Sequence, residues 1–412
     1  MRRDREQPAR PEQQGDAMRF ASAVSEARDA GAATAAVIDA VRIGLDALEP
    51  DLAFLFCSDA HAGAYERIAC ELREAMPSAL LVGCSARSVI GAGREIEDRP
   101  GLSLTAARLP GVTLSPMRLA GDGFPRGTSS WQEHFEIDAE PPPSFVVLAD
   151  PFSCDAEALV RQLDVDFADS TLVGGLASGA DRPGGNALFL GERVHEEGMV
   201  GVALQGDVCL DPVVAQGCRP IGHPLFVTRA RGNLLLEVDG RPPIEIVQGL
   251  FEAATPRDRA LMQASLFLGV EMRPELARYG RGDFLIRNLI GADERTGAFA
   301  IGASLHEGQV VQFHLRDAET SAEDLDARLA RYRTSHLGGA APAGALIFSC
   351  LGRGVHLYGV ADHDSDAFRR HVGPVPLGGF FCNGEIGPVE RHSFLHGYTS
   401  AFGLFRPRPR VS

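Results

Sequence analysis

The chain has 412 residues, of which 40 are basic and 55 are acidic, and its formal net charge is −15. All 40 basic residues are arginines, so the sequence contains no lysine. This excludes Schiff-base lysine enzymes, conventional P-loops and Ser-Lys nucleophile pairs. An acidic chain whose arginines are dispersed among carboxylates also lacks the basic stripe that binding to nucleic acid requires.

Apolar runs and cysteines predict a cytoplasmic protein. No apolar run approaches the length of a membrane span, and no basic segment leads into an apolar signal region. The eight cysteines form no C-x-x-C pair and no Cys/His pair at zinc spacing. We therefore expect reduced thiols, no disulfide framework, no metal site and no cofactor.

The N-terminal segment differs from the rest in composition. Residues 1–17 are rich in Arg, Glu, Gln and Pro without apolar spacing, so we expect a disordered tail. Met18 follows directly and is an alternative start of translation. Apolar stripes at i, i+4 spacing then predict helices, one around residues 37–48 and one over 65–76 that ends before Pro77.

A unit of strand, helix, strand and hairpin recurs along the chain. Copies occupy residues 53–84, 145–175 and 345–379, each with an apolar run, a helical segment and a second apolar run. A weaker fourth copy is predicted over 266–315, which would complete two pseudo-twofold domains. Because hairpins need antiparallel neighbours, the predicted fold class is α/β, with two domains built from repeated strand-helix-strand-hairpin units and mixed sheets.

The domain boundary is predicted at a proline-rich turn in the middle of the chain. Asp239-Gly-Arg-Pro-Pro243 separates a strand-like run from a segment with helical spacing, and proline suits the first turn of a helix. We therefore expect domains over residues 18–240 and 241–408. Further along, Ser321 with Asp324 resembles a capping arrangement that begins a surface helix.

Three blocks near the C-terminus combine many glycines with polar side chains. They are Phe348-Ser-Cys-Leu-Gly-Arg-Gly354, Gly378-Gly-Phe-Phe-Cys-Asn-Gly-Glu-Ile-Gly-Pro388 and Phe394-Leu-His-Gly-Tyr-Thr399. Glycine weakens a strand unless its backbone takes positive φ or approaches something closely. Arg353, Asn383 and Glu385 supply a guanidinium, an amide and a carboxylate among these glycines, which suits a binding pocket.

These blocks resemble the C-terminal signature of the FIST family, sensory domains named after F-box and intracellular signal transduction proteins. Val82-Gly-Cys-Ser-Ala-Arg-Ser-Val-Ile-Gly-Ala-Gly-Arg-Glu-Ile-Glu97 looks like the N-terminal signature, and Gln216-Gly-Cys-Arg-Pro-Ile-Gly222 with Gly232-Asn233 and Val238-Asp-Gly240 fits its middle. The resemblance covers residues 20–408. It implies a sensor of a small ligand but does not identify that ligand, which we expect to be an amino acid or a related small acid. A separate output protein would be the signalling partner.

The predicted ligand site gathers the polar residues and glycines of these blocks. Its members are Arg353, Asn383, Glu385, Cys350, Gly352, Gly354, Gly379, Gly384 and His396. The fork of Arg353 would hold an α-carboxylate, and Glu385 would accept an ammonium. Arg353 and Glu385 could equally pair with each other across adjacent strand ends. Arg287, Arg316 and Asp317, in blocks that also resemble the family, are second candidates for ligand contact or for the domain interface.

The residues leave two other functions open. Cys350 or Cys382 could pair with His396 in a hydrolase or transferase, although a hydrogen-bonded strand histidine explains His396 as well. A scaffold that only binds protein is the other alternative. Eukaryotic relatives of the family place an F-box ahead of this region, but residues 18–50 are too short and too rich in alanine for one.

Overall fold

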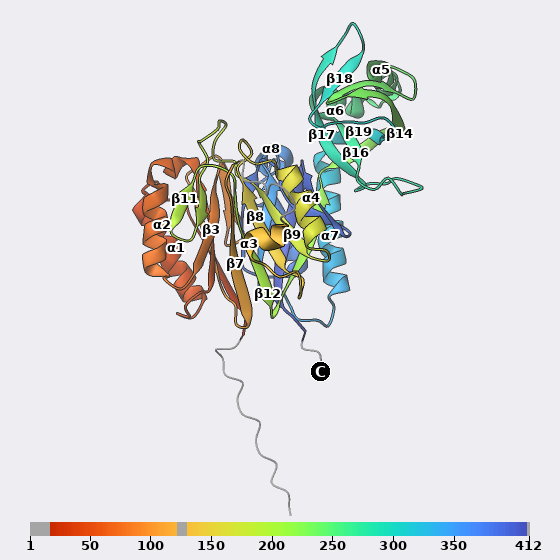
Figure 1. The fold of residues 1–412 in the computed structure, drawn as a ribbon. Helices are drawn as coiled ribbons and strands as arrows, with labels where there is room; N and C mark the ends of the chain where they lie inside the picture. The colour runs from red at the N-terminus through yellow and green to blue at the C-terminus, as the bar shows by residue number, and fades with distance from the viewer. Residues whose placement is uncertain (1–16, 122–129, 410–412) are drawn as a thin grey trace, which may run out of the picture.

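The computed structural model of the protein describes residues 17–121 and 130–409 (Figure 1). The tail predicted to be disordered lies, except for its last residue, outside the described residues. Three six-stranded sheets form the body of the molecule, and a closed six-stranded barrel stands beside it. No helix in the two described ranges is long and apolar enough to cross a membrane.

The three sheets of the body share one strand order. The first contains β1 (Arg19–Ser25), β6 (Leu102–Arg108), β2 (Leu52–Ser58), β3 (Leu80–Ala86), β10 (Leu188–Leu190) and β11 (Arg193–His195). The second contains β7 (Val112–Leu119), β12 (Met199–Gly206), β8 (Ser144–Ala149), β9 (Thr171–Leu176), β22 (Glu385–Val389) and β23 (His392–His396). The third contains β13 (Val208–Gln216), β24 (Thr399–Pro407), β20 (Gly344–Cys350), β21 (Leu377–Cys382), β4 (Ser88–Gly91) and β5 (Arg94–Ile96). In each sheet the two central strands are parallel, and the flanking strands are antiparallel to their neighbours.

A crossover helix joins the parallel pair of each sheet. Helix α2 (Tyr65–Ala75), after the short η1 (Asp59–Ala64), connects β2 to β3, and α4 (Ala156–Asp166) connects β8 to β9. Helix α9 (His363–Val372), preceded by α8 (Val355–Tyr358), connects β20 to β21. The remaining helices of the body are α1 (Ala30–Gly44), α3 (Trp131–Phe135) and α7 (Ala318–Ser335). The three predicted strand-helix-strand units are therefore confirmed, and with them the α/β class with mixed sheets.

The hairpin of each unit pairs with the sheet of another unit. Hairpin β4–β5 follows the first unit in the chain but adds to β21 of the third. Hairpin β10–β11 follows the second unit and adds to β3 of the first, while β22–β23 follows the third and adds to β9 of the second. The exchange is cyclic, so the strand ladders interlock all three units.

One glycine in each unit allows the two parallel strands to come close. It is Gly83, Gly174 or Gly379, and a Cβ at these positions would lie 2.0, 1.8 and 1.9 Å from the carbonyl oxygen of the residue opposite. No side chain tolerates such a contact without moving the backbone. The glycine that recurs in the second apolar run of every copy therefore reflects a close backbone contact.

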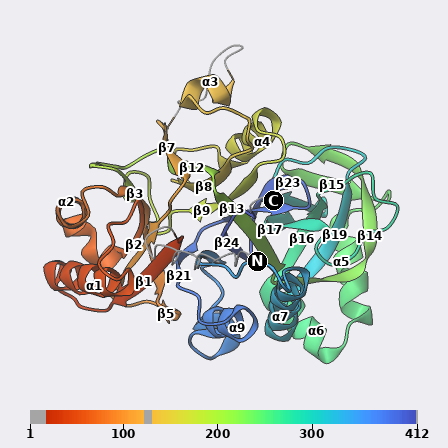
Figure 2. The same cartoon turned by 90° about the horizontal axis from the view of Figure 1, so that it is seen from below.

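The three sheets pack their inner faces against one another. Their common core takes large, fully buried side chains from each sheet, among them Phe54, Leu148 and Phe348. Figure 2 shows α1 and α2 outside the first sheet, α4 outside the second, and α7 and α9 outside the third. The outer face of each sheet forms a separate apolar core with these helices. Each sheet therefore buries one face against the other sheets and the opposite face against helices.

The barrel is inserted between β13 and α7. Its strands are β14 (Cys218–Arg231), β15 (Leu234–Val238), β18 (Ala298–Ile301), β17 (Phe284–Asp293), β16 (Leu266–Glu271) and β19 (Val310–Arg316), with α5 (Pro243–Ala253) and α6 (Pro256–Ser265) between β15 and β16. The predicted fourth copy of the unit is wrong. Residues 266–316 form antiparallel strands of this barrel without a crossover helix. The two pseudo-twofold domains are therefore not formed, because the body has three units and the barrel has its own core.

Candidate functional site

The parallel strands β20 and β21 end side by side at Cys350 and Cys382, which are partners in the register. In α/β folds, ligands bind beyond the carboxyl ends of parallel strands. Here that edge meets the barrel, because the side chain of Arg316, the last residue of β19, reaches Gly352. A Cβ at position 352 would lie 2.3 Å from Nη1 of Arg316, so the glycine makes room for the guanidinium. We call Cys350, Gly352, Glu385, Arg316 and Tyr398 the strand-end cluster.

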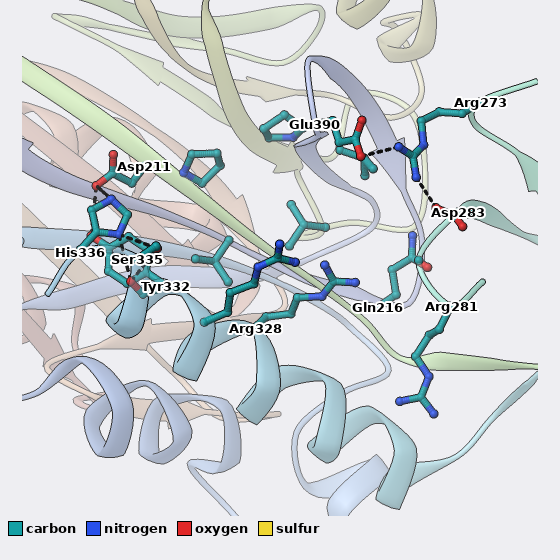
Figure 3. A pocket seen from close by; sticks show the side chains of 17 residues that line it. Asp211, Gln216, Arg273, Arg281, Asp283, Arg328, Tyr332, Ser335, His336 and Glu390 are labelled. Carbon is teal, nitrogen blue, oxygen red and sulfur yellow. Dashed lines mark hydrogen bonds and ion pairs between the residues drawn. The ribbon is translucent and has the colours of Figure 1, made fainter. Parts of the chain in front are cut away.

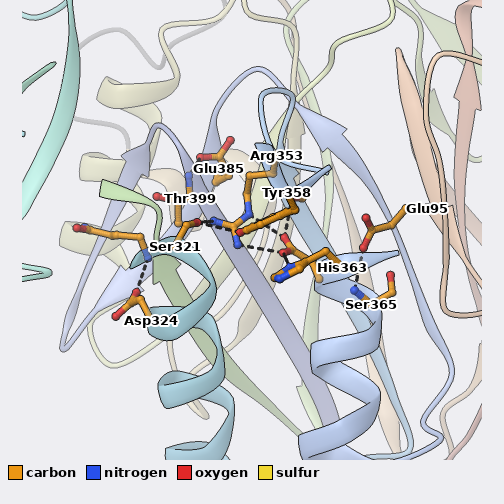
Figure 4. A network of polar contacts seen from close by, with 12 residues as sticks. Glu95, Ser321, Asp324, Arg353, Tyr358, His363, Ser365, Glu385 and Thr399 are labelled. Atoms are coloured by element: carbon orange, nitrogen blue, oxygen red, sulfur yellow. Dashed lines mark hydrogen bonds and ion pairs between the residues drawn. The ribbon is translucent and has the colours of Figure 1, made fainter. Parts of the chain in front are cut away.

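Arg353 lies next to the cluster in a buried ion pair (Figure 4). Its Nε donates to Oδ2 of Asp364 at 2.8 Å, its Nη2 donates to Oδ1 at 3.0 Å, and its Nη1 donates to Oγ of Ser321 at 2.8 Å. Although burial alone would raise the pKa of Asp364, Arg353 holds that pKa well below its usual range. The fork of Arg353 is thus taken by Asp364, and the pairing with Glu385 that the sequence left open is not formed.

Glu385 is fully buried at the start of β22. Its Oε2 accepts a hydrogen bond from the N–H of Thr399 at 3.0 Å, and its Oε1 accepts one from the thiol of Cys382 at 3.6 Å. Burial raises the pKa of Glu385 to about 8, against the opposing effects of these hydrogen bonds and of nearby guanidinium groups. Burial therefore favours the protonated form of Glu385, and the approach of a cation would favour its carboxylate.

Arg316 carries two hydrogen-bond donors that no described residue accepts from. Its Nε and Nη2 are shielded from solvent and have no hydrogen-bond partner among the described residues. An unsatisfied buried donor costs about 1–3 kcal/mol, and a charged one costs more. The ring of Tyr398 covers the guanidinium, with Cζ 5.0 Å from the ring centroid. Nε and Nη2 lie on the side-on edge of the guanidinium, which can donate two parallel hydrogen bonds to one carboxylate, so this edge of Arg316 suits an anion of that shape.

Tyr398 is held over Arg316 by an uncommon backbone conformation. Its φ is +64°, in the left-handed region that aromatic residues rarely adopt. Its carbonyl accepts a hydrogen bond from the N–H of Gly217 at 3.0 Å, which ties the loop between β23 and β24 to the strand that enters the barrel. The covering ring thus sits on a segment whose backbone stores conformational strain.

Cys350 is half-buried in the cluster. Burial raises the pKa of its thiol to about 11, and the charge of Glu385 adds to this, whereas Arg316 and the backbone N–H groups of Gly352 and Tyr398 oppose it. Cys382 is fully buried, and its one S–H is shared between Oε1 of Glu385 and the carbonyl oxygen of Ser349, which lies 3.3 Å from Sγ. Both cysteines are therefore neutral thiols at pH 7, as expected for thiols in apolar surroundings.

Two other predicted residues lie outside the cluster. Asn383 is exposed and donates to the carbonyl of Ala177 at 3.3 Å. His396 is buried with Nε2 2.9 Å from the carbonyl oxygen of Gly387, and burial lowers its pKa to about 4. Within the described ranges, no hydrogen bond joins His396 to either cysteine of the predicted Cys/His pair.

Arg287 and Asp317, the other two second candidates, have their polar groups bound by other residues of the protein. Arg287 pairs with Glu157 at 2.8 Å and donates to the carbonyl of Leu395. Asp317 caps α7 by accepting from the N–H of Glu319 at 3.0 Å, and it also pairs with arginines of the barrel. These two residues therefore connect the barrel to the body.

The glycines predicted for the site serve different contacts. A Cβ at Gly354, where φ is +68°, would collide with the carboxylate of Glu97, whose oxygens accept from the N–H of Val355. Gly379 is the close contact between β20 and β21 described above. Gly384 packs against the side chains of β9 and β23. Of the four glycines predicted for the site, only Gly352 belongs to the strand-end cluster.

Three residues of the site were missed by the sequence interpretation: Asp364, Tyr398 and Glu95. Asp364 lies on the apolar face of α9 beside buried Ala367 and Phe368, and a carboxylate on such a face signals a buried partner. Oε1 of Glu95 accepts from the N–H of Ser365 at 2.8 Å (Figure 4). Burial, together with the charge of Asp364, raises the pKa of Glu95 to about 8.

Comparisons with known proteins agree with the resemblance noted in the sequence. The family model described as the FIST N domain matches residues 51–241, and the one described as the FIST C domain matches residues 244–388. Uncharacterized proteins of Mycobacterium tuberculosis and Mycobacterium bovis are each 36% identical over 388 residues, which is 94% of this chain and 100% and 99% of theirs. F-box only protein 22 of Homo sapiens is 30% identical over 127 residues, 27% of this chain and 31% of that protein.

Proposed function

Because this chain belongs to the FIST family, whose domains are sensory domains of signal transduction, we propose that it senses a small organic acid at the strand-end cluster. The observation that carries the proposal is the unused side-on fork of Arg316. A ligand carboxylate would supply both missing acceptors in one bidentate contact. The amino-acid ligand, the cytoplasmic location and the separate output protein remain parts of this proposal.

Glu385 would decide between an amino acid and a simple acid. An ammonium group beside it would lower its raised pKa and convert it to a carboxylate, since an opposite charge favours ionisation. The cluster would then hold the two charges of a zwitterion on Arg316 and Glu385. Arg353 would act as a positioning residue, because its own fork is already satisfied by Asp364.

Entry of the ligand would require the ring of Tyr398 to move, because that ring covers Arg316. Release of the left-handed backbone at Tyr398 would favour this movement. The change would pass along β24, which follows Tyr398 directly and is the strand between β13 and β20 in the third sheet. A ligand-dependent position of Tyr398 would thus give the sensor its output.

The test is a thermal-shift screen of the twenty amino acids and the matching 2-hydroxy acids. We expect a ligand to raise the melting temperature of the parent, and Arg316→Gln to lower its affinity by about tenfold to a hundredfold, since charge-assisted hydrogen bonds contribute about 1.5–3 kcal/mol. Glu385→Gln should weaken an amino acid but not the hydroxy acid of the same side chain. Arg257→Gln is the matched control, because Arg257 is 61% exposed in its ion pair near the barrel. An equal shift in Arg316→Gln and the parent would refute the site.

A further inference from the structure

A cavity of about 670 Å³ lies between the body and the barrel (Figure 3). Four segments far apart in the chain form its walls: strand β13, the loop between β16 and β17, helix α7, and the turn between β22 and β23. Its volume is in the range of about 300–1,000 Å³ that is usual for small-molecule sites. No residue of the strand-end cluster lines it.

Four arginines line this cavity against three carboxylates, although the chain is acidic overall. Arg273 and Arg281 come from the loop, and Arg328 and Arg331 come from α7. We call the cavity the arginine groove. The loop lies close to the helix, because a Cβ at Gly282 would be 2.8 Å from Nη2 of Arg328. Arginines from the barrel and from the body thus line the same groove.

The carboxylates that line the groove already have cationic partners: Asp211 pairs with Arg406, and Asp283 and Glu390 pair with Arg273. In contrast, neither Arg281 nor Arg331 lies within ion-pair distance of a carboxylate in the described ranges. Arg328 has a single carboxylate contact of 3.4 Å to Asp324, four positions earlier on the same helix. Arg328 and Arg331 are also neighbours on α7, where like charges repel. The positive charge of the groove is therefore only partly compensated.

We propose that the arginine groove binds a small organic phosphate. A phosphoryl group offers three outer oxygens and about two negative charges, so it can accept from several guanidinium groups at once. A single carboxylate would satisfy only one fork. Apolar side chains of β13 and of the end of β22, including Val213, Val214 and Val389, line the same cavity and would contact the organic part of the ligand. The bound phosphate would bridge the barrel and the body at a place separate from the strand-end cluster.

Calorimetric titration of the full chain tests this assignment, with adenosine monophosphate and inorganic pyrophosphate as probes. Citrate and acetate serve as carboxylate probes at the same ionic strength. We expect at least one phosphate probe to bind, acetate not to bind, and the affinity for phosphate to fall as salt rises. Arg328→Gln and Arg331→Gln should each weaken phosphate binding by about tenfold or more, because each removes charge-assisted hydrogen bonds.

Arg333→Gln is the matched control, because Arg333 is exposed on α7 and does not line the groove. It should bind phosphate as the parent does. Equal weakening in this control, binding of citrate alone, or binding of none of the probes would overturn the proposal. Arg316→Gln should also keep phosphate binding, and its loss there would assign the phosphate to the strand-end cluster instead. Arg331 is exposed, so its variant tests the groove even if Arg328→Gln fails to fold.

Discussion

Replacing Arg353 by methionine should destabilise the protein more than any other single change at the candidate site. The variant leaves the carboxylate of Asp364 without its cation in a place where Asp364 is only 2% exposed. Breaking a buried ion pair costs about 3–5 kcal/mol, because the remaining charge is neither solvated nor paired. The three hydrogen bonds of 2.8 to 3.0 Å made by Arg353 argue for the upper half of that range.

This cost translates into a modest but measurable fall in melting temperature. The entropy of unfolding is about 2.1 cal/mol/K per residue, so a chain of 412 residues that unfolds as a unit should lose about 3–6 °C. Differential scanning calorimetry of the parent, Arg353→Met, Asp364→Leu and the double variant measures this. The double variant should recover much of the loss, because removing both charges leaves no buried ion behind.

The comparison with Arg316 separates a structural arginine from a binding one. Arg316→Gln should leave the melting temperature near that of the parent, since the donors it removes have no partner among the described residues. The reasoning would be refuted if Arg353→Met melted within 1 °C of the parent, or if Arg316→Gln were the less stable of the two.

Two further predictions concern pH and packing. Burial raises the pKa of Glu385 from 4.5 to about 8, so the folded state holds a proton that the unfolded state loses, and stability falls as pH rises through that window. Glu385→Gln should therefore raise the melting temperature at pH 8 but not at pH 5. The control Glu66→Gln, at an exposed position, should show no such difference between the two pH values. Equal effects of Glu385→Gln at both pH values would contradict this. Gly174→Ala should prevent soluble expression or lower the melting temperature strongly, because its Cβ would meet a backbone carbonyl at 1.8 Å. Gly249→Ala in α5, with open space around it, should be neutral or stabilising, and a tolerated Gly174→Ala would count against the close contact.

The repeated units could be predicted because their signals are local. Each copy has two apolar runs at nearly constant spacing with a helical stripe between them, as in the run from Ala53 to Cys84. The buried residues Val37, Val41 and Leu45 likewise lie on α1 and its cap as their spacing predicted. Period and spacing are properties of the neighbouring residues alone.

The exchange of hairpins and the barrel could not be predicted in the same way. Which sheet receives β4–β5 depends on pairing with β21, almost 300 positions away, and nothing in the local pattern encodes that partner. The fourth copy was predicted wrongly because its apolar runs fit a strand-helix-strand unit and a series of antiparallel strands equally well. Burial alternates at the start of β17, with Phe284 and Ile286 inside, and this period of two was the available signal for antiparallel strands.

The candidate site was predicted in place but not in detail. The glycine-rich blocks do bring Cys350, Arg353 and Glu385 together, yet the partner of Arg353 is Asp364. A buried carboxylate on α9 and an arginine eleven positions earlier meet only because the crossover helix folds back on β20. The start of α7 shows the same limit, since Asp317 rather than Ser321 caps the helix. Competing polar residues a few positions apart can be ranked only when their packing is known.

The inserted barrel explains why one of three equivalent strand ends differs from the others. At the end of the second unit, buried Asp150 is satisfied by Nδ2 of Asn186 at 2.8 Å and by Oγ of Ser153 at 2.5 Å. Asn186 in turn accepts from Oγ of Ser85 at the end of the first unit, so these side chains are paired within the body. At the third end, Arg316 extends from the barrel, and its Nε and Nη2 have no acceptor in the part of the chain that the structure describes. The cyclic exchange of hairpins makes the three units alike in topology, and only the insertion after β13 breaks that likeness. A site that needs one unpaired cation is therefore expected at the third strand end, where the barrel supplies it.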